Sequence, residues 1–362
     1  MSEVKIKIAA GTNPGLIRGN NEDNFIVSSN LGTSEWLIPQ VDECIDLGEF
    51  GAFLAVADGM GGANAGEVAS AIALETIQAH FVPEQLSNVI HDDKRIQDFM
   101  KVVVKNADQN ILNHSKEDSS TQGMGTTIVI AWILGNKAYI CWCGDSRCYV
   151  LNKRNGLVRL SKDHSYVQEL IDSGELDPEY ASDHPLSNVI TRCLGDLDNR
   201  AEPETRIWQL HDGDTIMLCS DGLSGLCHDE QILGIMIEFR DEPMECKNEL
   251  ISAALSNGGY DNVTVALCNI YMENDADDID EDEQDAEVSF KNDDEKSEEA
   301  LSKTIRSERV GRKKRLRFIL SILFLVVAMC VFFYYSNDCE PVRQQMMTTL
   351  NPYIIKLKGF IQ

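Results

Sequence analysis

The sequence predicts a protein of the α+β class, built from both strands and helices. Two long segments, residues 64–82 and 94–114, carry apolar residues at helical spacing. Several short apolar or β-branched runs, bounded by Gly, Asn or Asp, are typical of strands. With 362 residues, the chain is long enough for one large domain or two small ones with a sizeable core.

One stretch organises the rest of the chain. An apolar run from Phe53 to Ala57 ends in Asp58, and Gly59, Gly61 and Gly62 follow almost at once. The run predicts a buried strand that presents Asp58 at its end, where glycines let the backbone approach a ligand. A tight strand-to-helix turn with a capping aspartate is the alternative.

The expected strands are short runs spread over the whole domain. Lys5–Ala9 alternates Ile and Lys like a short edge strand, and Gly135-Asn136 supplies the turn of a hairpin. A helical pattern resumes from Asp229. The remaining expected strands are Thr126–Leu134, Ala138–Cys143, Cys148–Leu151, Thr215–Cys219 and Val263–Leu267.

Residues 163–200 differ in character from the rest and are expected to form an inserted flap. A short helical stretch, Tyr166–Ser173, is followed by two prolines and mixed polar residues. His164 and His184 in this region are candidates for acid–base chemistry, but we expect each to be solvated or structural.

Acidic residues recur where expected strands end or turn. Asp58, Asp145, Asp221 and Asp261 stand at such positions, and Asp23 lies beside a strand. Hard cations such as Mg²⁺ and Mn²⁺ prefer oxygen ligands, and no His/Cys cluster suggests zinc. Taken alone, Arg18 with Glu22 and Asp23 fits a solvated surface or a phosphate-facing arginine beside metal-facing carboxylates.

Six motifs, in order over residues 1–272, together resemble the PPM-type metal-dependent protein phosphatases, the type 2C serine/threonine phosphatase family. They are Arg18 with Glu22-Asp23, Asp58-Gly59-Met60-Gly61-Gly62, Gly125-Thr126-Thr127, Gly144-Asp145-Ser146-Arg147, Ser220-Asp221-Gly222-Leu223 and Asp261-Asn262-Val263-Thr264. The resemblance implies a central β-sandwich of two antiparallel sheets flanked by helices, in the layer order α-β-β-α.

The resemblance also implies a role for each matching residue. Asp58 would bridge two metal ions, Mn²⁺ or Mg²⁺, and the Gly59 carbonyl would bind the second ion. Asp221 and Asp261 would complete the first metal site, and Glu22 and Asp23 would hold metal-bound waters. Asp145 would form a third metal site together with Asp221, as in bacterial members. Arg18 would bind the substrate phosphate.

The implied chemistry is attack on phosphorus by a hydroxide that bridges the two metals, since paired cations lower the pKa of water. Arg18 can bind two phosphate oxygens at once. Animal members carry His where Met60 stands, and that His is a candidate general acid. Bacterial members commonly have Met there, so the acid stays unassigned.

The charge and cysteine content of the chain limit the kinds of molecule that we expect it to bind. The formal net charge of −27 makes nucleic acid an unexpected partner, because phosphates would be repelled. The 11 cysteines show no metal-ligand spacing and indicate a reducing compartment. The expected partners are phosphorylated proteins, among them a Ser/Thr kinase and its substrates.

The C-terminal part predicts a membrane anchor. An acidic linker over 273–305, expected to be disordered, precedes a basic segment, 306–317, that contains 7 Lys and Arg residues. Residues 318–335 are almost entirely apolar, and roughly 18 residues span about 27 Å as a helix. The basic cluster places the catalytic domain in the cytoplasm and leaves a short tail, 336–362, outside the inner membrane.

The sequence therefore predicts a membrane-tethered, cytoplasmic protein serine/threonine phosphatase. A non-catalytic pseudophosphatase that binds phosphoproteins is the alternative, although every carboxylate at a metal position is retained. A soluble phosphatase whose apolar C-terminal stretch docks a partner is a second alternative.

Overall fold

The computed structural model describes residues 4–33, 36, 43–61, 65–181, 184–196 and 201–272. The chain divides into two units, Met1–Asp277 and Asp278–Gln362, and all described residues belong to the first. The predicted linker, basic segment, transmembrane helix and tail, 273–362, lie outside the described residues. Among the residues described, no helix has the length and hydrophobicity needed to cross a bilayer.

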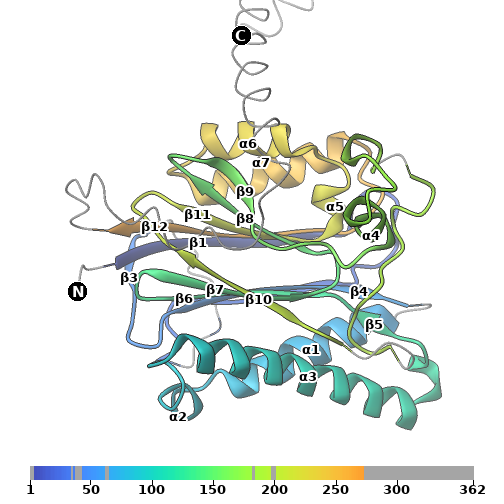
Figure 1. The fold of residues 1–362 in the computed structure, drawn as a ribbon, viewed down its shortest axis with the longest axis horizontal. Coiled ribbons are helices and arrows are strands. Elements are labelled where there is room, and N and C mark those ends of the chain that lie inside the picture. Colours follow the sequence, from blue (N-terminus) through green and yellow to red (C-terminus); the bar gives the residue numbers. More distant parts are fainter. Residues whose placement is uncertain are drawn as a thin grey trace, which may run out of the picture. The chain divides into compact units, whose positions relative to one another are not determined.

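Two antiparallel sheets stack face to face, as the resemblance implied (Figure 1). The first sheet has the order β3 (Ile45–Asp46), β1 (Val4–Asn13), β12 (Val263–Met272), β11 (Thr215–Cys219), β8 (Arg147–Asn152) and β9 (Gly156–Arg159). The second sheet has the order β10 (Glu204–Gln209), β7 (Lys137–Cys143), β6 (Ile128–Leu134), β4 (Ala52–Met60) and β2 (Asp23–Ser28), with β5 (Gly125–Thr126) paired to β4.

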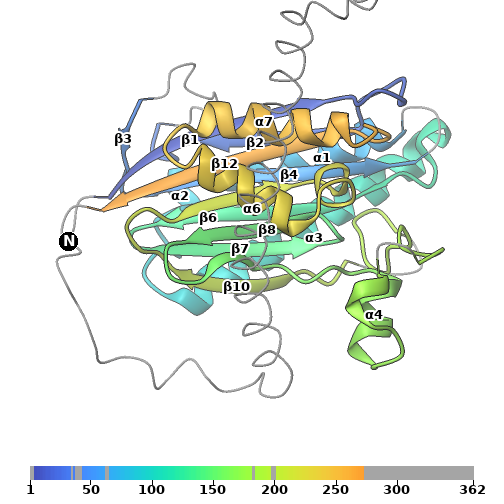
Figure 2. The same cartoon turned by 90° about the horizontal axis from the view of Figure 1, so that it is seen from above.

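Helices cover the outer face of each sheet (Figures 1 and 2). The second sheet carries α1 (Ala65–His80), α2 (Pro83–Leu86) and α3 (Asp93–Glu117), and the first carries α5 (Asp221–Ser224), α6 (Asp229–Glu238) and α7 (Pro243–Ser256). The predicted flap contains α4 (Tyr166–Asp172) and a 3-10 turn, Pro178–Tyr180. Figure 2 shows α4 lying outside the sandwich.

Three layers of apolar side chains hold this architecture together. Residues such as Val56 and Leu218 pack between the sheets, whereas Trp132 packs between the second sheet and α1 with α3. A third cluster, including Met217 and Leu250, joins the first sheet to α6 and α7. Burying each large apolar side chain stabilises the fold by roughly 1.5–3 kcal/mol. Because successive side chains of a strand point to opposite faces, one strand contributes to two of these layers.

Most predicted elements are confirmed, with two corrections. β1 extends to Asn13 and lies between β3 and β12, so the expectation of a short edge strand was wrong. Lys5 and Lys7 are partly buried, and the strand is paired along its whole length with β12. β4 continues past Asp58 to Met60 by pairing with β5, so Asp58 lies inside the strand instead of at its end.

The turn before β12 is tied to the turn after β1 by one buried side chain, Asn262. Its amide nitrogen donates to the Pro14 carbonyl at 2.9 Å and to the Asn20 carbonyl at 2.8 Å. Its amide oxygen accepts from the Glu22 N–H at 2.8 Å. One side chain therefore fixes the Arg18 loop and the start of β2 against Asp261.

We expect Asn262→Asp to lower the free energy of unfolding by about 2–4 kcal/mol. The substitution keeps the side-chain volume but removes both N–H donors, which leaves two carbonyls without a partner at roughly 1–3 kcal/mol each. Urea unfolding of the full chain, followed by tryptophan fluorescence, measures the change.

Asn155→Asp is the matched control, because Asn155 is exposed in the β8–β9 turn. It should change the free energy of unfolding by no more than about 0.5 kcal/mol. Equal effects of the two substitutions would contradict the role assigned to Asn262.

Candidate active site

The predicted acidic residues gather at one end of the sandwich, from segments far apart in the chain. Asp23, the first residue of β2, lies directly opposite Asp58 of β4 in the strand register. The Asp58 carboxyl lies close enough to that of Asp221, at the start of α5 on the other sheet, for each to shift the pKa of the other. Asp145, in the turn that leads from β7 to β8, lies near both Asp58 and Asp221.

Burial and mutual repulsion make this cluster difficult to ionise without added positive charge. Burial raises the pKa of Asp58 well above its usual range, and the carboxylates of Asp23, Asp221 and Asp145 raise it further. Burial likewise raises the pKa of Asp23 to about 7 and that of Asp145 to about 8. The pKa of Asp221 is raised by burial and then by Asp261.

Asp23 is held by two hydroxyl groups that flank other members of the cluster. Its Oδ2 accepts a hydrogen bond from Ser220, next to Asp221, and one from Thr264 of β12, each at 2.7 Å. Since Asp23 is buried, these bonds lower the cost of its burial and set the spacing of both sheets at the cluster.

Arg18 and Asp261 form an ion pair at the rim of the cluster. The Arg18 Nη2 donates to Asp261 Oδ2 at 2.7 Å, and about half of the arginine side chain is exposed. Glu22 lies nearby: burial raises its pKa, whereas Arg18 lowers it. The guanidinium keeps further N–H donors beyond the one that binds Asp261.

The backbone around Asp58 is closely packed and hydrogen-bonded. Its N–H donates to the Thr127 hydroxyl at 3.1 Å, and its carbonyl accepts from the Thr126 hydroxyl and the Thr127 N–H, each at 2.9 Å. A Cβ on Gly59 would lie 2.2 Å from the Gly66 carbonyl oxygen. Only glycine fits there, so β4 can approach α1 this closely.

The donor set fits a hard cation in its chemistry. The buried Oδ1 of Asp145 has no hydrogen-bond partner, and carboxylates are the ligands that Mg²⁺ and Mn²⁺ prefer. Within the ranges described above, no three His, Cys, Asp or Glu side chains are grouped at metal-ligand spacing. Several of the acids are engaged by protein groups instead: Asp261 by Arg18, Asp221 by Asp58, and Asp23 by two hydroxyls.

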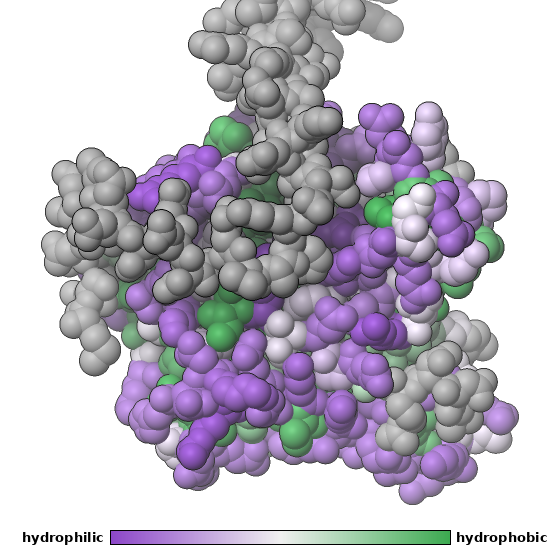
Figure 3. Space-filling model, viewed as in Figure 1, coloured by the Kyte–Doolittle hydropathy of each residue, from purple (hydrophilic) through white to green (hydrophobic). Residues whose placement is uncertain are grey.

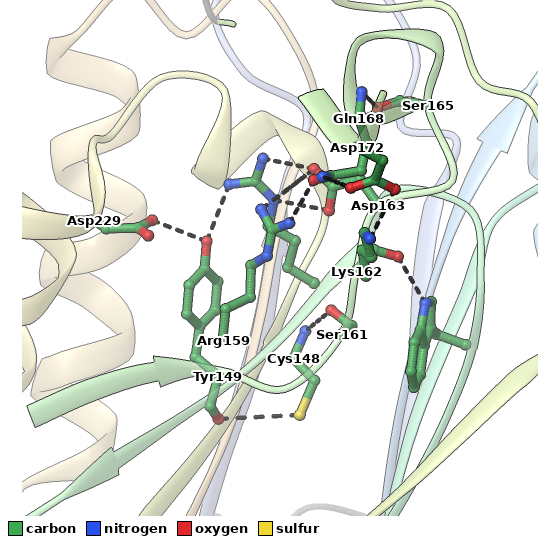
Figure 4. A network of polar contacts seen from close by, with 12 residues as sticks. Cys148, Tyr149, Arg159, Ser161, Lys162, Asp163, Ser165, Gln168, Asp172 and Asp229 are labelled. Carbon is green, nitrogen blue, oxygen red and sulfur yellow. Dashed lines mark hydrogen bonds and ion pairs between the residues drawn. The ribbon is translucent and has the colours of Figure 1, made fainter. Parts of the chain in front are cut away.

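Arg147, which follows Asp145 by two residues, binds Asp163 at the root of the predicted flap. Figure 4 shows Asp163 in a polar network that also contains Tyr149 and Asp229. The Arg147 guanidinium binds both oxygens of Asp163, with the shortest contact at 2.7 Å, and both side chains are largely buried. It also donates to Tyr149, whose hydroxyl donates to Asp229 at the start of α6. The network joins the Asp145 turn, the flap root and the helical layer.

His164 has a structural role beside Asp145, as expected for it. The ring Nδ1 of His164 accepts a hydrogen bond from the Gly144 backbone N–H at 3.1 Å, and the backbone N–H of His164 donates to the Gly144 carbonyl at 2.9 Å. The ring is buried beside Trp142 and lies 3.3 Å from Glu204. Burial, followed by the charge of Arg192, lowers the pKa of His164, which favours the neutral ring that this acceptor role needs.

Sequence reasoning assigned no role to several residues that position the cluster. Ser220 and Thr264 stand within three residues of Asp221 and Asp261, and this proximity was the available signal. The links made by Asn262, Asp163 and His164 join segments far apart in the chain, and no sequence pattern indicates them.

Known proteins resemble this chain over the described domain. The protein phosphatase 2C family matches residues 41–251. The Mycobacterium tuberculosis serine/threonine protein phosphatase PstP is 34% identical over 269 residues, which are 73% of this chain, and the chain spans 45% of that protein's length. The Listeria welshimeri serine/threonine phosphatase stp is 32% identical over 256 residues, which are 71% of this chain and 92% of that protein.

A solved structure matches over the same region. The catalytic domain of PstP in complex with 2 manganese ions aligns with a TM-score of 0.59 at 31% identity, and covers 74% of this chain and 99% of that one. The family match, the curated relatives and the shared architecture agree with the motifs and with the geometry of the cluster. The chain belongs to the protein phosphatase 2C family.

Proposed function

We propose that this chain is a metal-dependent protein serine/threonine phosphatase that hydrolyses phosphoserine and phosphothreonine. One observation carries the proposal: carboxylates from five separate segments meet at one end of the sandwich, beside a half-exposed arginine. Such a cluster repels a phosphate dianion until cations neutralise it, which suits a metal-dependent hydrolase.

The proposed ligands are the residues that the family motifs carry. Asp58, central in the cluster, would hold two ions, Mn²⁺ or Mg²⁺, with the Gly59 carbonyl on one of them. Asp221 and Asp261 would complete the first site, and Glu22 and Asp23 would hold metal-bound waters. Asp145, whose Oδ1 has no partner, would serve a third ion together with Asp221.

The side chains prepare the site in distinct ways. Divalent cations, when bound, supply an activated water for attack on phosphorus. Arg18 binds two phosphate oxygens through donors that Asp261 leaves free, and so orients the ester. Met60 donates no proton, which leaves the acid for the departing alcohol unassigned.

The proposed substrates are phosphorylated proteins, among them a Ser/Thr kinase and its targets. The relatives bear the names of serine/threonine phosphatases, and the PstP structure contains 2 manganese ions. The net charge of −27 makes nucleic acid an unexpected partner, because its phosphates would be repelled.

Replacing Asp58 with Asn should lower turnover by at least about 100-fold, because loss of a shared ligand removes several kcal/mol of transition-state stabilisation. Hydrolysis of p-nitrophenyl phosphate and of a phosphothreonine peptide by the full chain, with Mn²⁺, with Mg²⁺ and with chelator, measures the effect. Chelator should abolish wild-type turnover.

Asp98→Asn is the matched control, since Asp98 is an exposed acid on α3 that pairs with Lys94. It should leave both activities unchanged. Near-normal turnover by a folded Asp58→Asn protein would refute the metal assignment, and a wild-type protein inactive with every metal would favour the pseudophosphatase.

We further propose that a C-terminal helix over residues 318–335 tethers the domain to the inner membrane, with the catalytic domain in the cytoplasm. The support is the apolar composition of this segment and the basic residues of 306–317 before it. The acidic segment 273–305 would act as a spacer, and 336–362 would lie outside.

The full chain should therefore sediment with membranes, and a protein truncated after residue 300 should remain in the supernatant. Alkaline carbonate should fail to extract the full chain, because a spanning helix is held by its apolar length. Recovery of both proteins in the soluble fraction would contradict the anchor.

A further inference from the structure

We propose that Leu16, Ile17 and Tyr260, here called the apolar rim, form a docking surface for apolar side chains next to the phosphorylated residue of a protein substrate. This inference rests on the proposed phosphatase function and extends it to substrate selection. The apolar rim would recognise side chains of the substrate that do not contact the phosphate site.

The rim side chains are unusually exposed for their type. Ile17, Leu16 and Tyr260 are 71%, 65% and 61% exposed, and Tyr180 in the flap, at 62%, is the only other large apolar residue above 60% in the part of the chain described. The face shown in Figure 3 is mostly hydrophilic, with small separate apolar patches. Exposed apolar groups beside a candidate active site are typical of a binding surface.

The rim belongs to two turns that are held together rigidly. The Leu16 N–H donates to the Gly259 carbonyl at 2.7 Å, and Asn262 binds both sides of the same junction. A Cβ on Gly15 would lie 2.2 Å from the Asp261 carbonyl oxygen, and one on Gly259 would lie 2.9 Å from Leu16 Cγ. This close packing fixes the rim before any ligand binds, which lowers the entropic cost of binding.

The rim also stands directly beside the proposed phosphate site. Ile17 precedes Arg18 in the chain, and Tyr260 precedes Asp261, the partner of Arg18 at 2.7 Å. Adjacent Cα atoms are about 3.8 Å apart, so a phosphate on Arg18 brings the neighbouring residues of its chain within reach of the rim.

Charge and size favour a substrate chain over other occupants. Residues 1–272 contain 41 Asp and Glu residues against 19 Lys and Arg residues, so an anionic lipid surface would repel this domain, whereas an apolar peptide side chain would not be repelled. Three side chains cover far less than the roughly 800 Å² per partner of a stable dimer. A segment of a few peptide residues matches the extent of the rim.

The test compares two phosphothreonine peptides of equal length and charge, with Leu or Ser on both sides of the phosphothreonine. The full chain in detergent should show a kcat/KM about five- to tenfold higher for the Leu peptide, as expected for partial burial of apolar surface. The double variant Leu16→Ser with Ile17→Ser should lose this preference but hydrolyse p-nitrophenyl phosphate, which has no flanking chain, at the wild-type rate. Tyr260→Ser should reduce the preference independently.

Val102→Ser on α3 and Ile237→Ser on α6 are matched controls, being 55% and 54% exposed on the outer helical layers. Both should keep the full preference. If the wild-type protein hydrolyses p-nitrophenyl phosphate but shows equal kcat/KM for the two peptides, the role of the apolar rim in substrate selection is refuted and the proposed phosphatase function stands.

Two further outcomes would also overturn the rim as a substrate surface. One is an equal loss of p-nitrophenyl phosphate turnover in the double variant, which would indicate damage to the site itself. The other is rim-dependent binding to phosphatidylserine vesicles, or rim-dependent dimerisation, with unchanged peptide kinetics. Failure of the wild-type protein to hydrolyse p-nitrophenyl phosphate would instead refute the proposed function.

Discussion

Repulsion among closely spaced carboxylates, of which Asp23 and Asp145 are buried and Asp58 and Asp221 partly buried, is the constraint on which the candidate site depends. The carboxylates of Asp23, Asp145 and Asp221 each raise the pKa of Asp58, and burial raises the pKa of all four. The fold must hold them together in spite of this cost. A divalent cation relieves the same repulsion, so the arrangement that is costly without metal suits metal binding.

The surrounding structure supplies the groups that resist the repulsion. Ser220 and Thr264 hydrogen-bond to Asp23, and Thr126 with Thr127 holds the backbone of Asp58. Asn262 performs the same task for the Arg18 loop. The bonds from Ser220 and Thr264 to Asp23 join one sheet to the other, so the stability of the sandwich and the geometry of the cluster depend on each other.

The flap is joined to the site through its root. Arg147 and Asp163 form a largely buried pair next to Asp145, and His164 binds Gly144 through both its ring and its backbone. A movement of α4 that disturbed these contacts would reach the Asp145 turn directly. The Arg18 loop is fixed by Asn262 instead, so the flap root and the Arg18 loop are held by different residues.

Local patterns were sufficient for most elements and for the identity of the acids. The helical spacing in α1 and α3, the Gly135-Asn136 hairpin and the apolar runs of β4 and β11 are local signals, and the structure confirms them. β1 was taken for an edge strand because its partner along its whole length, β12, lies at the far end of the domain sequence. The continuation of β4 beyond Asp58 depends likewise on pairing with β5.

The sequence by itself determined which residues are candidates for the chemistry, because a carboxylate, an arginine or a glycine has its properties wherever it stands. It also determined their order, and through the motifs it indicated the family. Only the tertiary structure decided that β7 and β8 belong to different sheets, so that the Asp145 turn passes between them. It alone decided that Asn262 reaches Pro14, and that Asp163 reaches Arg147. Such contacts depend on the packing of whole layers, and a local stretch of sequence carries no record of the distance between its side chains and those of a remote strand.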